Sequence, residues 1–221
     1  MSDTLMPNNL MTDKKINKHE LRTKETRELL LQSAEKIFVR DGYEGAELGE
    51  IAALAGRTKG AIYAQFKSKE DIFLALIDQR TVAYRSHMLE MLARSTSTEE
   101  NLATLRAFYL EMTEDRAWAL LLLEFKLFAI RHPESKEKLQ RQFDELVPAN
   151  REKVYAELLG PAEKGPDAVS RSVAIQMIQP MLSALAVETK LRPAFLDDRT
   201  ITKVINRIFD ALMLPHPISK R

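Results

Sequence analysis

The segment from Arg57 to Phe66 combines two kinds of side chain at helical spacing. Ile62 and Phe66 are four residues apart, so on a helix they share one face that is suited to a core. The opposite face carries short or polar side chains, namely Lys59, Ala61, Ala64 and Gln65. Gly60 adds no side chain where a backbone would approach a ligand closely. Such a helix is suited to the major groove of DNA, where glutamine pairs with adenine and alanine contacts a thymine methyl.

Two further helices are expected ahead of this one. The first runs from about Thr23 to Arg40 with one apolar face, and Gly42 follows it where a left-handed cap favours glycine. The second covers about Glu47 to Leu54 and ends at the turn Ala55-Gly56. Thr58 is a good N-cap for the third helix. Three short helices with a tight glycine turn between the last two describe a helix-turn-helix.

The same region resembles the DNA-binding domain of the TetR (tetracycline-repressor-like) family. The resemblance extends from about Thr23 to Leu76, or about a quarter of the chain, and several separate blocks carry it. These blocks are Ala34…Phe38, Asp41-Gly42-Tyr43, Ile51-Ala52, Ala55-Gly56, Thr58-Lys59-Gly60-Ala61-Ile62-Tyr63…Phe66 and Ser68-Lys69-Glu70. The resemblance implies a transcriptional regulator, a repressor by default, that binds double-stranded operator DNA and responds to a small molecule.

The resemblance also implies roles for single residues. Tyr63 matches a tyrosine whose hydroxyl binds a phosphate, and Lys69 matches a lysine that contacts the phosphate backbone. Lys59 and Gly60 lie where family members touch phosphate or base edges, and Thr58 is a further candidate for phosphate contact. Contacts of this kind set register and salt dependence, whereas base contacts set sequence preference.

Three positions depart from the family pattern. Ala46 stands where a threonine usually caps the second helix and contacts phosphate, and Gly49 stands where a longer polar side chain is common. Arg57 replaces a small apolar residue before Thr58 and is a candidate for a substitute phosphate contact. These departures affect the expected contacts of the second helix and leave the motif intact.

The rest of the chain is also predicted to be helical, giving an all-α fold of about nine helices. A long helix capped by Ser68 continues to about Arg94, and five more are expected at 98–113, 116–131, 134–159, 168–190 and 198–214. Pro148 and Pro180 each predict a bend or a boundary. The predicted organisation is a flexible tail (1–19), a helix-turn-helix domain (20–68) and a helical ligand-binding and dimerisation domain (69–221).

The run from Trp118 to Phe128 is apolar around most of its circumference, which indicates a central helix. Plain core is the first interpretation, and the lining of a cavity for an apolar or amphipathic effector is the second. The candidate lining residues are Phe108, Tyr109, Met112, Trp118, Leu122, Phe125, Met177 and Met181. Glu124 is either a buried acceptor or anion for a cationic ligand, or a side chain that reaches solvent or pairs with Lys126 or Arg116.

Composition excludes several classes. The chain has no cysteine, and its four histidines lack ligand spacing, so no metal site or cofactor is expected. No phosphate loop or nucleophile motif appears, so an enzyme is not predicted. No apolar run is long enough for a membrane span and no signal peptide is evident, which predicts a cytoplasmic protein.

The net charge of +1 hides an asymmetry. From Lys14 to Lys69 there are 12 lysines and arginines against 8 acids, which is a basic footprint of the kind that nucleic acid attracts. Lys14, Lys15 and Lys18 fit either a basic arm along DNA or, as the preferred interpretation, a solvated tail.

A helix-turn-helix module usually binds DNA as a two-fold dimer, so a homodimer on a palindromic operator is predicted. The resemblance assigns dimerisation to the last two helices, whose apolar stripes are Ile175, Ile178, Leu182, Leu185, Ile201, Ile205, Ile208, Phe209 and Leu212. A ligand that tilts the long helix after Ser68 is expected to release DNA. Two alternatives remain at this point: a helical small-molecule-binding protein that has lost DNA binding, and a helical enzyme.

Overall fold

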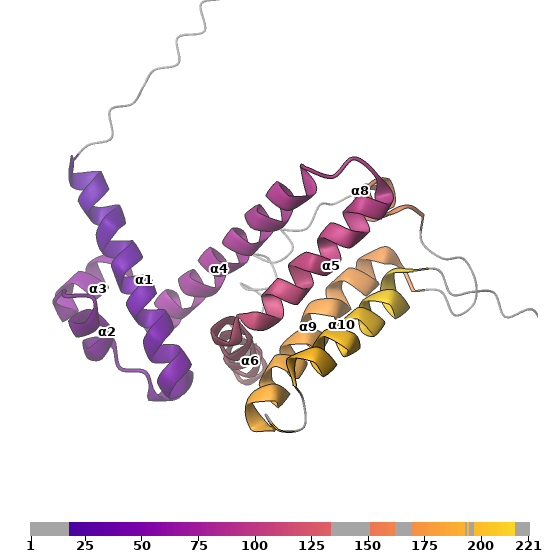
Figure 1. Cartoon of the computed structure of the whole chain (residues 1–221). Coiled ribbons are helices and arrows are strands. Elements are labelled where there is room, and N and C mark those ends of the chain that lie inside the picture. Colours follow the sequence, from indigo (N-terminus) through magenta and orange to yellow (C-terminus); the bar gives the residue numbers. More distant parts are fainter. Residues whose placement is uncertain (1–17, 134–150, 162–168, 193, 195–196, 215–221) are drawn as a thin grey trace, which may run out of the picture.

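The computed structural model describes residues 18–133, 151–161, 169–192, 194 and 197–214. Within these ranges every helix or strand is an α-helix, so the all-helical prediction is confirmed. Three helices gather at one end of the molecule, and a fourth runs from them into a layer of longer helices (Figure 1). We call residues 18–66 the head and residues 98–213 the body. The fourth helix belongs to both.

The helices of the described residues are α1 (Lys18–Gly45), α2 (Leu48–Leu54), α3 (Lys59–Gln65), α4 (Lys69–Leu92), α5 (Thr98–Glu114), α6 (Arg116–Arg131), α8 (Arg151–Leu159), α9 (Arg171–Leu191) and α10 (Asp198–Met213). Most predicted ends agree to within a few residues. The first part of the predicted helix 134–159, with the bend at Pro148, lies outside the described residues. So do most of the predicted tail and of the loop after Gly160.

Side-chain caps explain why α3 and α4 begin where they do. The Thr58 hydroxyl accepts a hydrogen bond from the Ala61 N–H at 3.3 Å, and the Ser68 hydroxyl accepts one from the Asp71 N–H at 3.1 Å. The Asp71 carboxylate in turn accepts from the Lys67 N–H at 3.0 Å, so the second cap is reciprocal. Both caps agree with the sequence prediction.

Two helices differ from their predictions at glycine and proline. Helix α1 begins at Lys18, about one turn earlier than predicted, and it is kinked at Gly42, where φ is +71° and ψ is 177°. That conformation is open almost only to glycine. Helix α9 contains Pro180 without ending there, which excludes the boundary from the two outcomes, bend or boundary, that were predicted at this residue.

One apolar core joins the head to the body. It contains buried residues from α1 to α4, and α6 adds Trp118, Leu121, Leu122, Phe125 and Phe128. The Phe73 ring of α4 lies 4.8 Å from Phe38 and 5.8 Å from Phe128 between ring centroids. A second core lies wholly in the body and is built from α5, α8, α9 and α10. The central apolar helix predicted at 116–131 therefore places its large buried side chains in the core shared with the head, and it also packs against α9 of the body.

Candidate functional site

The turn between α2 and α3 sets the angle of the helix-turn-helix. Gly56 has a φ of +63°, and its N–H donates to the Ala53 carbonyl at 3.0 Å. The next N–H, that of Arg57, donates to the Ala52 carbonyl at 2.9 Å. These two bonds complete a glycine C-cap of the Schellman type. They hold α3 in a fixed direction from the end of α2.

Helix α3 has one buried face and one free face, as predicted. Ile62 is fully buried, and Phe66 just after the helix is 2% exposed. On the other side, Lys59, Gly60 and Ala64 are exposed, and Tyr63 is 54% exposed. Ala61 and Gln65 are half-buried at the edges. An exposed aromatic side chain between a lysine and small residues is available to a partner and contributes little to the core.

Lys69 lies at the first residue of α4, where it makes contacts that the sequence did not predict. Its ammonium donates to the carbonyls of Glu44 at 3.0 Å and Ala46 at 3.3 Å, and it lies 4.9 Å above the centre of the Tyr43 ring. An ammonium has three N–H donors, so one is left for another acceptor. Lys69 thus ties the start of α4 to the loop before α2.

The beginning of α2 shows the effect of having Ala46 where the family pattern has a capping threonine. The N-cap residue is Glu47, one position later than expected, and its side chain makes no capping bond. Ala46 is 2% exposed and belongs to the core. Glu50 in the first turn pairs with Arg40 at 2.7 Å, which offsets its negative charge. The helix therefore starts without the side-chain cap of the family pattern.

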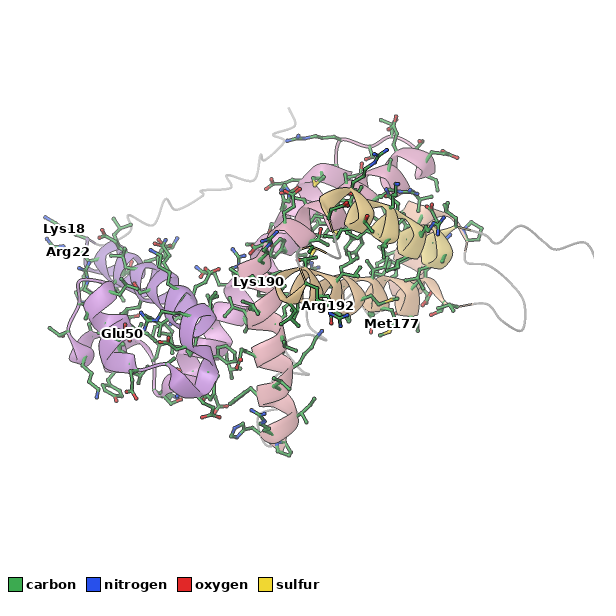
Figure 2. All side chains as sticks on the ribbon, turned by 60° about the horizontal axis from the view of Figure 1, so that its bottom comes forward. Lys18, Arg22, Glu50, Met177, Lys190 and Arg192 are labelled. Carbon is green, nitrogen blue, oxygen red and sulfur yellow. The ribbon has the colours of Figure 1, made fainter. Side chains whose placement is uncertain are left out.

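Arg57 leads to a basic row on α1, of which the sequence analysis considered Lys18 but missed Arg22. Its Nε donates to the Thr26 hydroxyl of α1 at 3.4 Å, so Thr26 faces the turn before α3. Arg22 and Lys18 lie one and two turns earlier on the same face of α1, because they precede Thr26 by four and eight residues. Both are exposed, and they lie together at the free end of α1 (Figure 2). Their four-residue spacing was the available signal, but the helix was expected to begin only at Thr23.

The structure separates the predicted ligand residues into four places. Tyr109, Met112 and Trp118 do line one cavity, between α5, α6 and α9, but its volume is about 10 Å³. That is room for about one water molecule. Leu122 and Phe125 are buried in the core shared with the head, and Phe108 is buried in the body core. These three side chains line none of the cavities described here.

Met177 and Met181 lie elsewhere. They are 47% and 41% exposed, and with Val173 at 49% they form an apolar row on α9 (Figure 2 labels Met177). Four of the nine residues predicted for dimer contacts are instead buried in the body core, namely Ile178, Leu182, Ile205 and Phe209. Both assignments were made from residue type, which does not tell which face of α9 points inward.

Larger spaces lie on either side of α5. A cavity of about 190 Å³ lies between α4, α5, α8 and α9, and of the predicted ligand residues only Tyr109 lines it. Its other lining residues are Arg85, Met88, Leu89, Leu92, Leu105, Val154, Tyr155, Leu158, Leu159 and Ile175. A groove of about 490 Å³ between the α5–α6 corner and α9–α10 contains Thr113, Glu114, Arg116, Thr189 and Thr202 among its walls.

Two polar contacts connect body and head. Glu124 of α6 accepts a hydrogen bond from the Tyr43 N–H at 3.2 Å, so of the roles expected for it the structure shows that of an acceptor, with a backbone N–H of the head as the donor. Arg80 of α4 pairs with Glu35 of α1 at 3.6 Å and also with Asp115 at the start of α6. These contacts link the positions of α4 and α6 to that of α1.

Asp115 holds several donors at once. Its carboxylate accepts hydrogen bonds from the Tyr84 hydroxyl at 2.6 Å and the Trp118 N–H at 2.9 Å, besides pairing with Arg80. Burial acts to raise the pKa of Asp115, but these donors outweigh it and the pKa is lowered. For Tyr84, burial and the same contact raise the pKa of the hydroxyl.

The all-helical fold, with the short helix α3 joined to α2 by a tight glycine turn, defines a helix-turn-helix protein. Residues 30–76 match the family model described as bacterial regulatory proteins, tetR family. The uncharacterized HTH-type transcriptional regulator TtgW of Pseudomonas putida is 30% identical over 124 residues, which cover 56% of this chain and 73% of that protein. The chain belongs to the TetR family.

Other proteins are similar to this chain over a shorter stretch of sequence or in their fold alone. The HTH-type transcriptional repressor BepR of Brucella suis is 42% identical over 66 residues, which cover 30% of this chain and 32% of BepR. The match thus spans about a third of the length of that relative. The crystal structure of the transcriptional regulator FadR from Bacillus subtilis, in complex with stearoyl-CoA, shares the fold with a TM-score of 0.63 at 17% identity. That likeness covers 85% of this chain and 97% of FadR.

Among the described helices, none combines the length and the apolar character that a membrane span requires. The same residues hold no group of three or more histidines and acids that is placed to bind a metal ion.

Proposed function

We propose that the chain is a ligand-responsive transcriptional repressor, which binds a palindromic operator as a homodimer and releases it when a small molecule binds the body. The observation that carries this proposal is the free face of α3. Ile62 and Phe66 hold the helix on the head, and the exposed Lys59, Tyr63 and Ala64 remain available to a groove.

The DNA contacts divide by side-chain type. Tyr63, Thr58, Arg57 and the remaining N–H of Lys69 are proposed to bind phosphates. Base edges are left to Lys59, Ala61, Ala64 and Gln65, with Gly60 allowing close approach. The exposed Lys18 and Arg22 extend the phosphate contacts along the flank of the half-site, because their row on α1 continues from the turn that holds Arg57.

A dimer is supported by the outer face of α9. Val173, Met177 and Met181 form an apolar row that no described helix covers. Burying such a row between two copies is favourable, and a two-fold dimer places two α3 helices about one DNA turn, ~34–36 Å, apart.

Release is proposed to act through α4 and α6. Helix α4 begins at Lys69 in the head and ends in the body, and Arg80 in its middle pairs with both α1 and the start of α6. A ligand that prefers a tilted α4 by a factor of ~100 supplies ~2.7 kcal/mol to shift the head. The repressor name of BepR and the stearoyl-CoA complex of FadR support this proposal for the family.

The test is fluorescence anisotropy of the full chain with DNA that flanks its own coding region, at two salt concentrations. Tight binding that weakens steeply with salt is expected, and Tyr63→Ala with Lys69→Ala should abolish it. The matched control is Lys153→Ala with Arg94→Ala, since both are exposed and lie far from the head. A genome-wide pull-down identifies an operator located elsewhere. Failure to bind any DNA in both experiments would favour the binding protein that has lost DNA recognition.

A further inference from the structure

The 190 Å³ cavity is apolar on nearly all sides. Helix α4 contributes Arg85, Met88, Leu89 and Leu92, which are spaced as one stripe of a helix. Helices α5, α8 and α9 add mostly leucine, isoleucine and valine, and two tyrosines. Such a wall favours the hydrocarbon part of a ligand.

Arg85 is the exception in this wall. It is the one charged side chain among the described lining residues, and no acid lines the cavity with it. It is half-buried, and within the described part of the chain its guanidinium has no hydrogen bond, ion pair or ring contact. Two other half-buried arginines do have acidic partners: Arg80 pairs with Asp115, and Arg106 with Asp210. A guanidinium against an apolar wall without an acceptor favours an anion from outside.

The other polar groups of the cavity do not oppose a negative charge. The Tyr109 side chain is 5% exposed, and burial together with Tyr155 raises the pKa of its hydroxyl. The hydroxyl therefore stays neutral at physiological pH and is able to donate a hydrogen bond. The described lining thus presents one guanidinium, two tyrosine hydroxyls and no carboxylate.

The volume limits the size of the ligand. This volume of about 190 Å³ is many times that of the single-water cavity beside Trp118. Ligand sites usually measure about 300–1,000 Å³, so this cavity suits a small molecule with a short apolar body.

We infer that this cavity binds a small amphipathic anion, with its acidic group at Arg85 and its apolar body between α5, α8 and α9. This inference rests on the proposed function, since it names the chemical class of the effector. Because Arg85 lies on α4, the anion acts directly on the helix that joins body and head.

Calorimetry of the full chain tests the inference with three probes of equal chain length: octanoate, 1-octanol and octylamine. Octanoate is expected to bind at least about tenfold more tightly than the other two, as one charge-assisted hydrogen bond implies. Arg85→Gln should remove this preference, and Arg85→Lys should keep most of it. Arg94→Gln, which changes an exposed arginine just after α4 that does not line the cavity, should leave it unchanged.

Equal binding of octanoate and octanol, no binding of any probe, or equal preference in Arg85→Gln and Arg94→Gln would each overturn the inference. Operator binding is measured on the same samples without a probe. Loss of the proposed function appears there as missing DNA affinity in the unmodified chain, whereas a wrong ligand class appears only in the calorimetry.

Discussion

The head and the body differ in how they use their apolar side chains: the head supports an exposed helix on a filled core, and the body leaves cavities between its helices. The head presents a convex polar surface on a helix of seven residues, and that helix is held by Ile62 and Phe66 against a core it shares with α4 and α6. The body encloses space, with cavities between long helices and an uncovered apolar row on α9. A recognition surface needs rigid support, whereas a ligand site needs room. The contacts between head and body therefore determine how strongly ligand binding in the body alters the position of the recognition helix.

The largest effect is expected from cutting the shared core. Phe73→Ala should lower the free energy of unfolding by about 3–5 kcal/mol, because the ring is fully buried against both α1 and α6. Urea unfolding followed by circular dichroism and by the fluorescence of Trp118, the sole tryptophan, should give one coincident transition. Phe209→Ala in the body core is the matched control with a similar loss. Two separate transitions in the unmodified chain would contradict a shared core.

A smaller effect is expected at the kink of α1. Gly42→Ala forces a side chain into positive φ and places its Cβ 3.2 Å from a Glu124 carboxylate oxygen, at an expected cost of about 1–3 kcal/mol. Gly56→Ala is the matched control, since its φ is also positive but no atom lies within 4 Å of the added Cβ. In thermal unfolding Gly42→Ala should be the more destabilising change, and Glu124→Ala should relieve part of the excess. Equal losses at the two glycines would show that the contact with α6 contributes nothing.

Asp115→Asn tests the link between α4 and α6. The loss should be about 1–2 kcal/mol near neutral pH, because the carboxylate accepts charge-assisted hydrogen bonds and is only part-exposed. The pKa of Asp115 is lowered in the folded chain, so its stabilisation is present above the unfolded value of ~3.9 and is lost as pH falls below it. The difference in stability between the two proteins should shrink from about pH 6 to about pH 3. A difference that does not change over this range would argue against an ionised Asp115 as the link.

The smallest change in stability is expected at the free end of α1. Lys18→Ala with Arg22→Ala should leave the melting temperature within about 1 °C, since both side chains are exposed. The slope of log K against log salt for DNA binding should fall by about 2, or ~0.9 for each lost phosphate contact. Lys153→Ala with Arg94→Ala should not alter the slope. An unchanged slope in the α1 variant would limit the DNA surface to α3 and its caps.

Sequence patterns located the head well because its signals are local. Thr58 and Ser68 cap helices within three residues, and Gly56 permits a turn that depends on its own φ. The body depends on which face of a helix meets which neighbour, and that is set by contacts distant in sequence. Met177 and Ile178 are adjacent and both apolar, yet one is exposed and the other buried. Arg85 gave no signal, because its lack of an acidic partner among the described residues is a property of the folded arrangement.

The shared core also bears on modularity. Similarity to the family model ends at residue 76, but the apolar surface that completes the head comes from Trp118 to Phe128, more than 40 residues later. The segment that matches the family model thus lacks part of the core that covers it in the whole chain. A chimaera that joins this head to the body of a relative must also supply a matching face on the sixth helix. Recombination between such proteins is therefore constrained at α6 as much as at the recognition helix.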